Sequence, residues 1–260
     1  MRFVIAAITD KGEFKRVNQD SAAAAIGCSG IGMSAFAIVC DGVGSLERSE
    51  VASSYAVKRF IGWFDDSYAD IADMNDEDEF CSLLYEKWRG LLDNINSGIY
   101  NYAKKHSMKL GTTLSCVLVR NGCYYVMQVG DSRVYCLTDR IKLITTDHTV
   151  AEQEIEKGRL DPQTAKTDKR RHILTRCIGT RERVRADFFT DKIEAPAKLL
   201  VCSDGFRDKI TETQLYKALC ENKTVKKERL ERVAEKVIGS VRRKKEKDNI
   251  TAAIIEICEE

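Results

Sequence analysis

The sequence contains little of what usually marks linkers between domains. Only 2 of its 260 residues are proline, and no stretch rich in proline, or in glycine and serine, separates one part of the chain from another. Apolar residues make up 43% of the chain, which is enough to bury a sizeable core. We therefore expect one domain over residues 1–260, without an internal repeat.

Long hydrophobic runs are also missing. The apolar start, residues 1–8, ends in Thr9-Asp10-Lys11, which is typical of a first strand rather than of a signal peptide. No run approaches the roughly 18 apolar residues of a membrane span. The net charge of +2 argues against a nucleic-acid surface. We expect neither a membrane nor a nucleic acid as partner.

The cysteines lack the spacing of a zinc site. The chain has 10 of them, and none form a Cys-x-x-Cys pair. Without an export signal, so many thiols indicate a reducing cytoplasm. Cys40, Cys116 and Cys202 stand inside apolar runs, so we expect them to be small buried side chains.

Hydrophobic periodicity predicts an α+β fold. Helices are expected from about Ser49, within 76–106, and over 149–158, 211–220 and 226–241, because their apolar residues recur at helical spacing. Strands are expected over 2–8, 22–27, 34–40, 112–119, 123–129, 134–137, 141–145, 199–203 and 250–257. The pair Asn121-Gly122 predicts a hairpin, and we interpret 112–145 as one antiparallel meander. Residues 159–182 are polar, basic and irregular.

Four acidic residues stand at ends of the expected strands or in turns. They are Asp41, Asp131, Asp204 and Asp248, and the first three adjoin a glycine. Each alone is explained equally well as a turn or cap carboxylate. Together they predict a cluster that the fold assembles from distant parts of the chain. Because the expected ligands are all oxygen atoms, the cluster favours Mg²⁺ or Mn²⁺ over zinc.

Seven short motifs carry a family resemblance. In chain order they are residues 9–20 with Asn18-Gln19-Asp20, Asp41-Gly42-Val43-Gly44 with 49–53, Gly111-Thr112-Thr113, 130–135, 146–149, Ser203-Asp204-Gly205 and Asp248-Asn249-Ile250-Thr251. Each is unspecific alone, but the order is highly specific. The sequence resembles the metal-dependent serine/threonine phosphatases of the type 2C family, in particular the bacterial-like ones, over nearly the whole chain.

The resemblance implies a sandwich of two antiparallel sheets, with helices on both outer faces and a flap-like segment near 149–196. It implies two cations, Mn²⁺ or Mg²⁺, bridged by the water that attacks the phosphoester. Asp41 would bridge both ions and the carbonyl of Gly42 would bind one. Asp204 and Asp248 would complete the first ion's shell, and Asp131 with Asp204 would form a weaker third site. Asp20 would orient water from outside the ligand shell.

The chain departs from the family pattern near the phosphate. Lys15, with Arg16 beside it, stands where an arginine usually grips the phosphate, and lysine lacks the bidentate fork. Gln19 replaces a frequent glutamate, and Ser45-Leu46 replaces a more usual Gly-His. Val43 stands where some members have a histidine proposed as general acid, so the leaving group's proton must come from water on a cation.

The function implied is hydrolysis of phosphoserine and phosphothreonine in proteins, the substrates of a cognate kinase, by a cytoplasmic monomer. Two alternatives stay open. One is a catalytically weak or dead relative that binds phosphoproteins, and the other is a metal-dependent hydrolase of small phosphoesters. His148 is interpreted as a packing or hydrogen-bonding residue of its turn rather than as a catalyst. Substrate choice is assigned to a mobile surface over 159–182.

Overall fold

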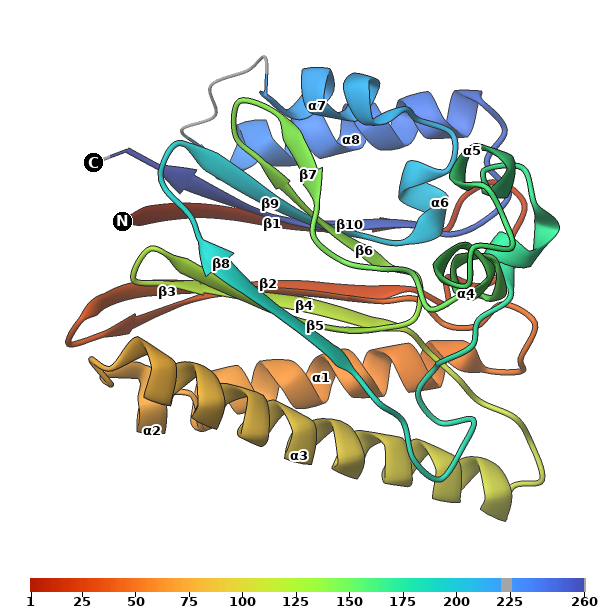
Figure 1. Ribbon diagram of the computed structural model, residues 1–260, viewed down its shortest axis with the longest axis horizontal. Helices are drawn as coiled ribbons and strands as arrows, with labels where there is room; N and C mark the ends of the chain where they lie inside the picture. The colour runs from red at the N-terminus through yellow and green to blue at the C-terminus, as the bar shows by residue number, and fades with distance from the viewer. Residues whose placement is uncertain (221–225, 260) are drawn as a thin grey trace.

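The computed structural model describes residues 1–220 and 226–259. Within these residues, two five-stranded antiparallel sheets pack face to face (Figure 1). The first sheet has the order β1 (Arg2–Asp10), β10 (Ile250–Cys258), β9 (Ala197–Cys202), β6 (Arg133–Leu137) and β7 (Ile141–Leu143). The second has the order β2 (Ser21–Ser29), β3 (Gly32–Cys40), β4 (Leu114–Arg120), β5 (Cys123–Val129) and β8 (Asp187–Lys192).

Helices cover both outer faces of the sandwich (Figure 1). Outside the second sheet lie α1 (Ser49–Asp66), α2 (Ala69–Ala72) and α3 (Glu77–Lys105). Outside the first sheet lie α7 (Glu212–Cys220) and α8 (Lys227–Arg243). Four short helices gather at one end: α4 (Val150–Glu156), α5 (Pro162–Ala165), the 3₁₀ helix η1 (Lys169–His172) and α6 (Asp204–Arg207). The predicted fold class is therefore confirmed.

Three apolar layers hold the sandwich together. Strand β3 shows why its sequence is an unbroken apolar run: Phe36 and Ile38 pack toward the helices, whereas Ala37 and Val39 pack toward the other sheet. Both faces of the strand are covered, so neither needs polar residues. A third layer lies between the first sheet and α8. Cys40, Cys116 and Cys202 are fully buried as predicted.

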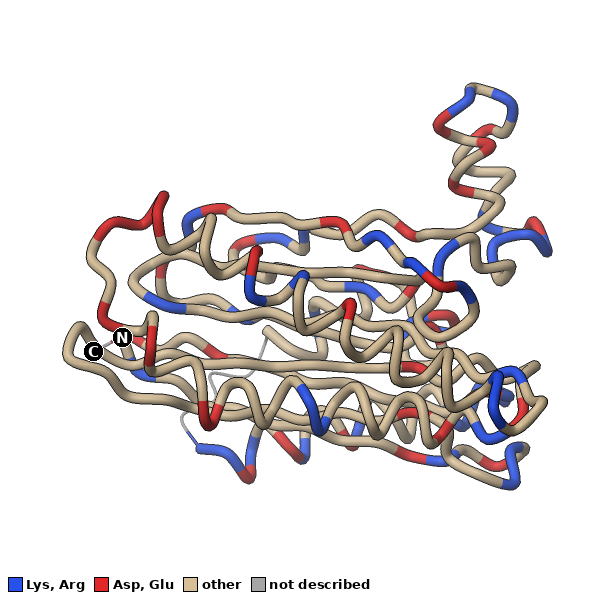
Figure 2. The backbone as a smooth tube through the Cα atoms, turned by 90° about the horizontal axis from the view of Figure 1, so that it is seen from below, with Lys and Arg blue, Asp and Glu red and all other residues tan. Residues whose placement is uncertain are grey.

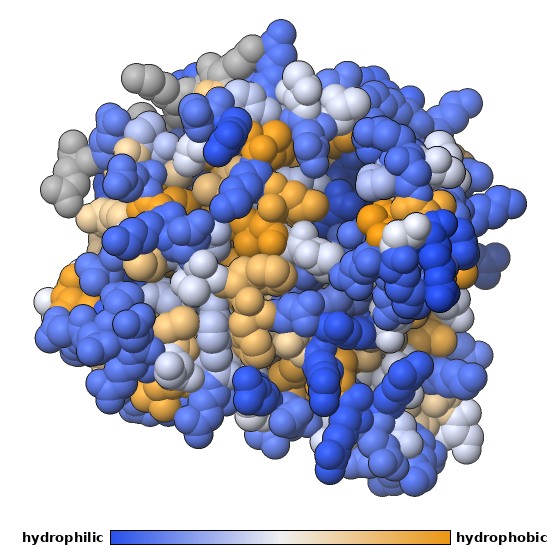
Figure 3. Space-filling view, viewed as in Figure 1, coloured by the Kyte–Doolittle hydropathy of each residue, from blue (hydrophilic) through white to orange (hydrophobic). Residues whose placement is uncertain are grey.

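The surface is correspondingly mixed. Figure 2 shows acidic and basic residues interspersed along the chain, and hydrophilic side chains cover most of the face in Figure 3. Among residues 1–220 and 226–259, no helix combines the length and apolar character needed to cross a membrane.

The meander predicted over 112–145 is wrong at one connection, the one between β5 and β6. Asn121 (φ 45°) and Gly122 (φ 73°) do form the predicted hairpin between β4 and β5. After β5, however, the chain turns and crosses to the facing sheet, where β6 pairs with β7 and β9. Strand spacing alone cannot separate the two topologies, because a hairpin and a crossing both need only a short turn.

Two regions hold structure that the sequence analysis missed. Strand β8 pairs with β5 at the edge of the second sheet, although half of its six residues are exposed and its apolar signal is short. The polar segment 159–182, predicted to be irregular, contains α5 and η1. Side chains of Asp161 and Asp168 cap these helices by accepting from main-chain N–H groups, which lets so polar a segment form local turns.

Candidate active site

The structure brings the four predicted carboxylates together at one end of the sandwich. Asp41 follows β3, Asp131 follows β5, Asp204 begins α6 directly after β9, and Asp248 precedes β10. Burial raises the pKa of Asp41 well above its ordinary value, and the charges of Asp20, Asp204, Asp131 and Asp248 raise it further. A carboxyl group that senses so many others lies within a common cluster.

Main-chain contacts position Asp41 and the residue after it. The N–H of Asp41 donates to Oγ1 of Thr113 (2.9 Å), and its carbonyl accepts from the N–H of Thr113 (2.8 Å). The N–H of Gly42 donates to the carbonyl of Gln19 (3.1 Å). The turn that carries both predicted ligands, the Asp41 carboxylate and the Gly42 carbonyl, is thus tied to two neighbouring segments.

A close main-chain approach brings Asp204 beside Asp248. A Cβ atom at Gly205 would lie 2.0 Å from the carbonyl oxygen of Asn249, so only glycine allows α6 to begin there. This explains why the Ser203-Asp204-Gly205 motif needs its glycine, which the sequence alone showed only as a turn residue.

Several buried oxygens of the cluster fit divalent cations. Within the described residues, both carboxylate oxygens of Asp20 and Oδ1 of Asp204 are buried without a hydrogen-bond partner. Burial raises the pKa of Asp20 to about 7, and burial together with the charge of Asp204 raises that of Asp131 to about 8. Unpaired carboxylates are costly to bury, and oxygen ligands of this kind suit Mg²⁺ and Mn²⁺.

Of the two predicted phosphate-binding residues, the structure brings only Lys15 to the cluster. Its Nζ lies 2.6 Å from Oδ1 of Asp248. Burial alone would lower the pKa of Lys15, but Asp248, Asp41 and Asp204 together raise it, so the ammonium is charged. Arg16 is exposed, and none of the contacts in the described part of the chain joins it to these carboxylates.

Asn249 holds the loop that carries Lys15, a role that the sequence analysis missed. Its Nδ2 donates to the carbonyls of Lys11 (2.8 Å) and Val17 (3.2 Å), and its Oδ1 accepts from the N–H of Gln19 (2.9 Å). Asn249 is 2% exposed. Its place directly after Asp248 was the one available signal, but its partners lie at the other end of the chain.

A buried network of ion pairs lies next to the carboxylate cluster, and the sequence analysis did not predict it. Nη2 of Arg207 donates to the main-chain carbonyl of Asp131 (3.1 Å), and Nη1 donates to Oδ1 of Asp208 (2.9 Å). Arg133 binds both oxygens of Asp147, each at 2.8 Å. Burial would raise the pKa of Asp147, but Arg207 and Arg133 lower it, so these ions stay charged and hold the turn of Asp131.

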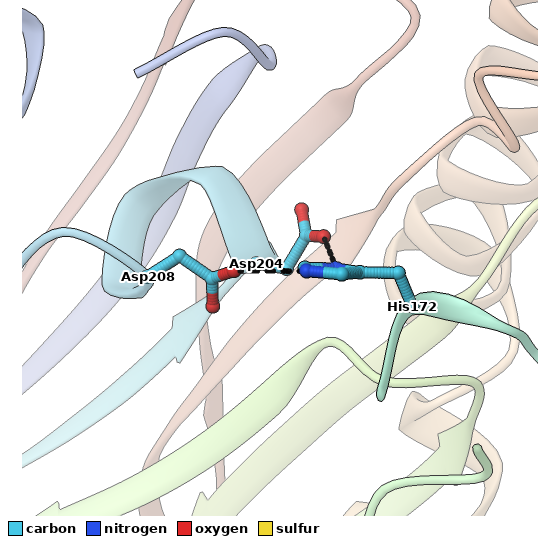
Figure 4. Close-up of side chains that lie close together, drawn as sticks. All are labelled: His172, Asp204 and Asp208. Carbon is cyan, nitrogen blue, oxygen red and sulfur yellow. Dashed lines mark ion pairs between the residues drawn. The ribbon is translucent and has the colours of Figure 1, made fainter. Parts of the chain in front are cut away.

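The flap, residues 149–196, docks on α6 through ion pairs. In Figure 4, His172 reaches from the flap toward Asp204 and Asp208. Its Nδ1 lies 3.5 Å from Oδ2 of Asp204, and its Nε2 lies 3.8 Å from Oδ2 of Asp208. Nη2 of Arg171 lies 3.0 Å from the same oxygen of Asp208. The hydrogen bond with Asp204 raises the pKa of His172, so this contact favours the charged form of the ring beside a predicted metal ligand.

An open cavity of about 450 Å³ lies between the flap and α6. Its lining includes Arg133, Lys166, Arg171, His172 and Arg207, together with acidic residues. Its lining does not include the predicted cation ligands or Lys15, and its three arginines pair with Asp147 or Asp208. The cavity therefore adjoins the carboxylate cluster rather than containing it.

The comparisons with known proteins agree with this architecture. The family model described as protein phosphatase 2C matches residues 13–252. A serine/threonine phosphatase, stp, of Listeria monocytogenes is 26% identical over 252 residues, covering 95% of this chain and 93% of the relative. The crystal structure of the serine/threonine phosphatase Stp1 from Staphylococcus aureus superposes with a TM-score of 0.84 and 26% identity, covering 100% of this chain and 96% of that one.

A structure of the catalytic domain of the serine/threonine protein phosphatase PstP, in complex with 2 manganese ions, superposes with a TM-score of 0.77. It is 23% identical and covers 99% of this chain and 100% of that one. The chain belongs to the protein phosphatase 2C family, the metal-dependent serine/threonine phosphatases that its motifs predicted. It is an enzyme of that class, and its fold is the one that the class shares.

Proposed function

We propose that this phosphatase hydrolyses phosphoserine and phosphothreonine in proteins at the carboxylate cluster, with Mn²⁺ or Mg²⁺ as its cations. The observation that carries the proposal is the cluster of carboxyl groups around Asp41 beside the charged Lys15, in which the buried Oδ1 of Asp204 has no hydrogen-bond partner among the described residues. Asp41, Gly42, Asp204 and Asp248 would hold two ions, and Asp131 with Asp204 would hold a weaker third. When bound, such ions activate water and neutralise charge that develops on the phosphoryl group.

The chain's own residues supply binding, orientation and the protein environment. The ammonium of Lys15 would bind the phosphoryl oxygens as a point charge, held in place by the loop that Asn249 fixes. The free carboxylate oxygens of Asp20 can accept hydrogen bonds from water and so orient it. Val43 carries no proton to donate, and we propose that water protonates the leaving oxygen of the substrate.

Two observations weigh against the alternative functions. A phosphoprotein-binding module without activity would have no need to keep Asp41, Asp131, Asp204 and Asp248 in one cluster, against their mutual repulsion. A hydrolase of small phosphoesters would gain little from a flap with exposed basic residues beside the site. We propose phosphoproteins as substrates for this reason.

We further propose that the substrates come from a serine/threonine kinase in the same cytoplasm. All ten cysteines are free thiols, which is the usual state in a reducing compartment.

The function is tested by phosphate release from a phosphothreonine peptide and from a small aryl phosphate. We expect no turnover in excess chelator and recovery with Mn²⁺. Asp41→Asn and Asp204→Asn should each lower kcat by several orders of magnitude, because each removes a charge that would face the ions.

The matched control is Asp93→Asn, an exposed residue of α3, which should behave as wild type. Full activity in excess chelator would rule out the metal-dependent mechanism. Turnover of the aryl phosphate without turnover of the peptide would favour the small-phosphoester alternative.

A further inference from the structure

The last part of the flap forms another open cavity, of about 400 Å³. Four arginines line it, and none of its lining residues is acidic. The arginines are Arg176, Arg181, Arg183 and Arg185. The cavity between the flap and α6 also has basic residues, but acidic side chains lie among them. We call the cavity with the four arginines the arginine cavity.

Three of these four guanidinium groups have no carboxylate partner in the described part of the chain. Arg176 is the exception, because its Nη1 donates to Oδ1 of Asp187 (2.6 Å). Arg181, Arg183 and Arg185 are exposed, and within residues 1–220 and 226–259 no ion pair involves their side chains. Positive charges gathered around one cavity attract an anion, so the arginine cavity suits a negatively charged group.

A buried asparagine of α3 fixes the main chain that carries these arginines. Nδ2 of Asn96 donates to the carbonyls of Arg181 and Glu182, both at 3.0 Å, and its Oδ1 accepts from the N–H of Gly179 (2.8 Å). Gly179 has a φ of +88°, and a Cβ atom there would lie 2.3 Å from Cγ2 of Ile99, so the chain before β8 lies directly against α3 (Figure 1). A loop held in this way loses little conformational freedom when it binds a partner.

The arginine cavity adjoins the carboxylate cluster. The main chains of Thr112 and Ile178 exchange two hydrogen bonds (2.9 and 3.2 Å), and Oγ1 of Thr112 donates to the carbonyl of Asp41 (3.0 Å). Thr180, which lines the cavity, lies so close to Gly111 that a Cβ atom on this glycine would be 3.0 Å from its Cγ2. A peptide whose phosphate lies at the cluster can therefore reach the arginines with residues a few positions away.

We propose that the arginine cavity is a subsite for acidic side chains that flank the phosphorylated residue of a protein substrate. A guanidinium group binds a carboxylate through two parallel hydrogen bonds, and clusters of arginines recognise acidic motifs in other proteins. The proposal rests on the function proposed above and names the sequence feature that a substrate needs. The subsite is built from Arg181, Arg183 and Arg185, and not from the basic residues of η1.

Exposed arginines allow the cavity to be changed without breaking an ion pair of the described residues. Arg183→Gln with Arg185→Gln removes two charges, and Arg183→Glu with Arg185→Glu reverses them. The matched control is Arg59→Gln with Arg140→Gln, which removes two exposed arginines, one of α1 and one of the turn between β6 and β7. Both glutamine doubles change the net charge equally, so they separate contact in the cavity from long-range attraction by the whole chain.

The experiment uses the full chain with Mn²⁺ and matched phosphothreonine peptides. The peptides carry glutamates, glutamines or lysines at successive positions on one side or the other of the phosphothreonine. In wild type we expect kcat/KM to be roughly three- to tenfold higher for the best-placed glutamates than for glutamines, mainly through KM, because exposed ion pairs are individually weak and act in both the ground state and the transition state. The glutamine double at 183 and 185 should lose this preference, and the glutamate double should prefer lysines. The control double should keep the preference of wild type.

Fluorescence anisotropy of the same peptides without phosphate gives a measure of binding that needs no turnover. If glutamate peptides bind more tightly than glutamine peptides, and only while Arg183 and Arg185 are present, the subsite stands even if no phosphopeptide is hydrolysed, and only the function proposed above fails. Equal binding and equal hydrolysis of the glutamate and glutamine peptides would overturn the subsite. So would an equal loss of the preference in the control double, or a matching fall in turnover of a small aryl phosphate, which has no flanking residues.

Discussion

At the scale of single residues, the candidate active site places the ammonium of Lys15 close to several carboxylates. Lys15 is kept charged by three carboxylates, and it occupies the position where the family resemblance predicts an arginine. An ammonium binds a phosphoryl group as a point charge, whereas a guanidinium binds it with two parallel hydrogen bonds. If Lys15 binds the phosphate as proposed, we expect fewer directed contacts to the phosphoryl group than the family pattern implies.

Substitutions at Lys15 should separate binding from chemistry. Lys15→Ala should raise KM for a phosphopeptide roughly tenfold and lower kcat less, because the contact exists in both the ground state and the transition state. Lys15→Arg should lower KM if the fork fits. Steady-state kinetics with Arg16→Ala as the matched comparison checks this, since Arg16 is exposed. A KM that rises only in Arg16→Ala would transfer phosphate binding to that residue.

At the scale of elements, the flap is the part whose sequence says least about its contacts. Its basic residues look alike in the sequence, yet the structure gives them different partners. Arg170 pairs with Asp168 inside the flap, and Arg171 reaches across to Asp208, directly after α6. Lys169 is exposed beside them. The expectation that 159–182 is mobile and selects substrates stays a prediction.

These partners divide the expected effects of neutralising the basic residues. Lys169→Ala with Arg170→Ala should lower kcat/KM on a phosphoprotein by roughly three- to tenfold and leave aryl phosphate turnover unchanged, because exposed charges act mainly on encounter with a charged partner. Arg171→Ala should lower both rates, since Asp208 adjoins the helix of Asp204. Equal losses on both substrates in the double variant would show that these residues support the metal centre instead.

At the scale of the whole molecule, a large apolar core carries a cluster of buried acids. The three apolar layers hold the sandwich together. The fold that they stabilise keeps several carboxylates closer to one another than they would be in the unfolded chain. Burial raises the pKa of Asp20 to about 7 and, with Asp204 nearby, that of Asp131 to about 8. Without cations, the burial and mutual repulsion of these carboxyl groups therefore lower the free energy of unfolding of the protein.

Removing the cations should therefore lower the thermal stability of the protein. Excess chelator should lower the midpoint of thermal unfolding by several degrees, because ions that bind only the folded chain stabilise it. In chelator the midpoint should then rise as the pH falls from 8.5 to 6.5. In that window the folded protein binds protons at Asp20 and Asp131 that the unfolded chain, with ordinary carboxyl groups, does not bind.

Calorimetry at several pH values checks this prediction. Below about pH 6.5 the trend should weaken, because burial lowers the pKa of His148 in the folded protein, so the unfolded chain takes up a proton there at higher pH than the folded chain does. Asp131→Asn should reduce the slope between pH 8.5 and 6.5. A midpoint that is constant or falls over this range in chelator would contradict the role given to these acids.

Some features of the fold could be predicted because their signals are local. The hairpin at Asn121-Gly122 needs two residues with positive φ, and the buried β3 needs an unbroken apolar run, so both appear in a few consecutive residues. Strand β8 was not predicted, because an edge strand with half of its residues exposed has only a short apolar pattern in the sequence. The crossing after Val129 was not predicted, because the residues of a turn do not determine which sheet the following strand joins.

The sequence by itself determined the family, because motif order is a property of the chain, and the resemblance in turn implied the sandwich and the acidic residues of the site. Only the tertiary structure decided the partners of these residues. Asn249 binds Lys11 and Val17 from the far end of the chain, Arg207 binds the carbonyl of Asp131, and His148 joins Gly130 to Asp187. Contacts between residues so distant in sequence depend on how the two sheets and the flap pack, and no local pattern records that.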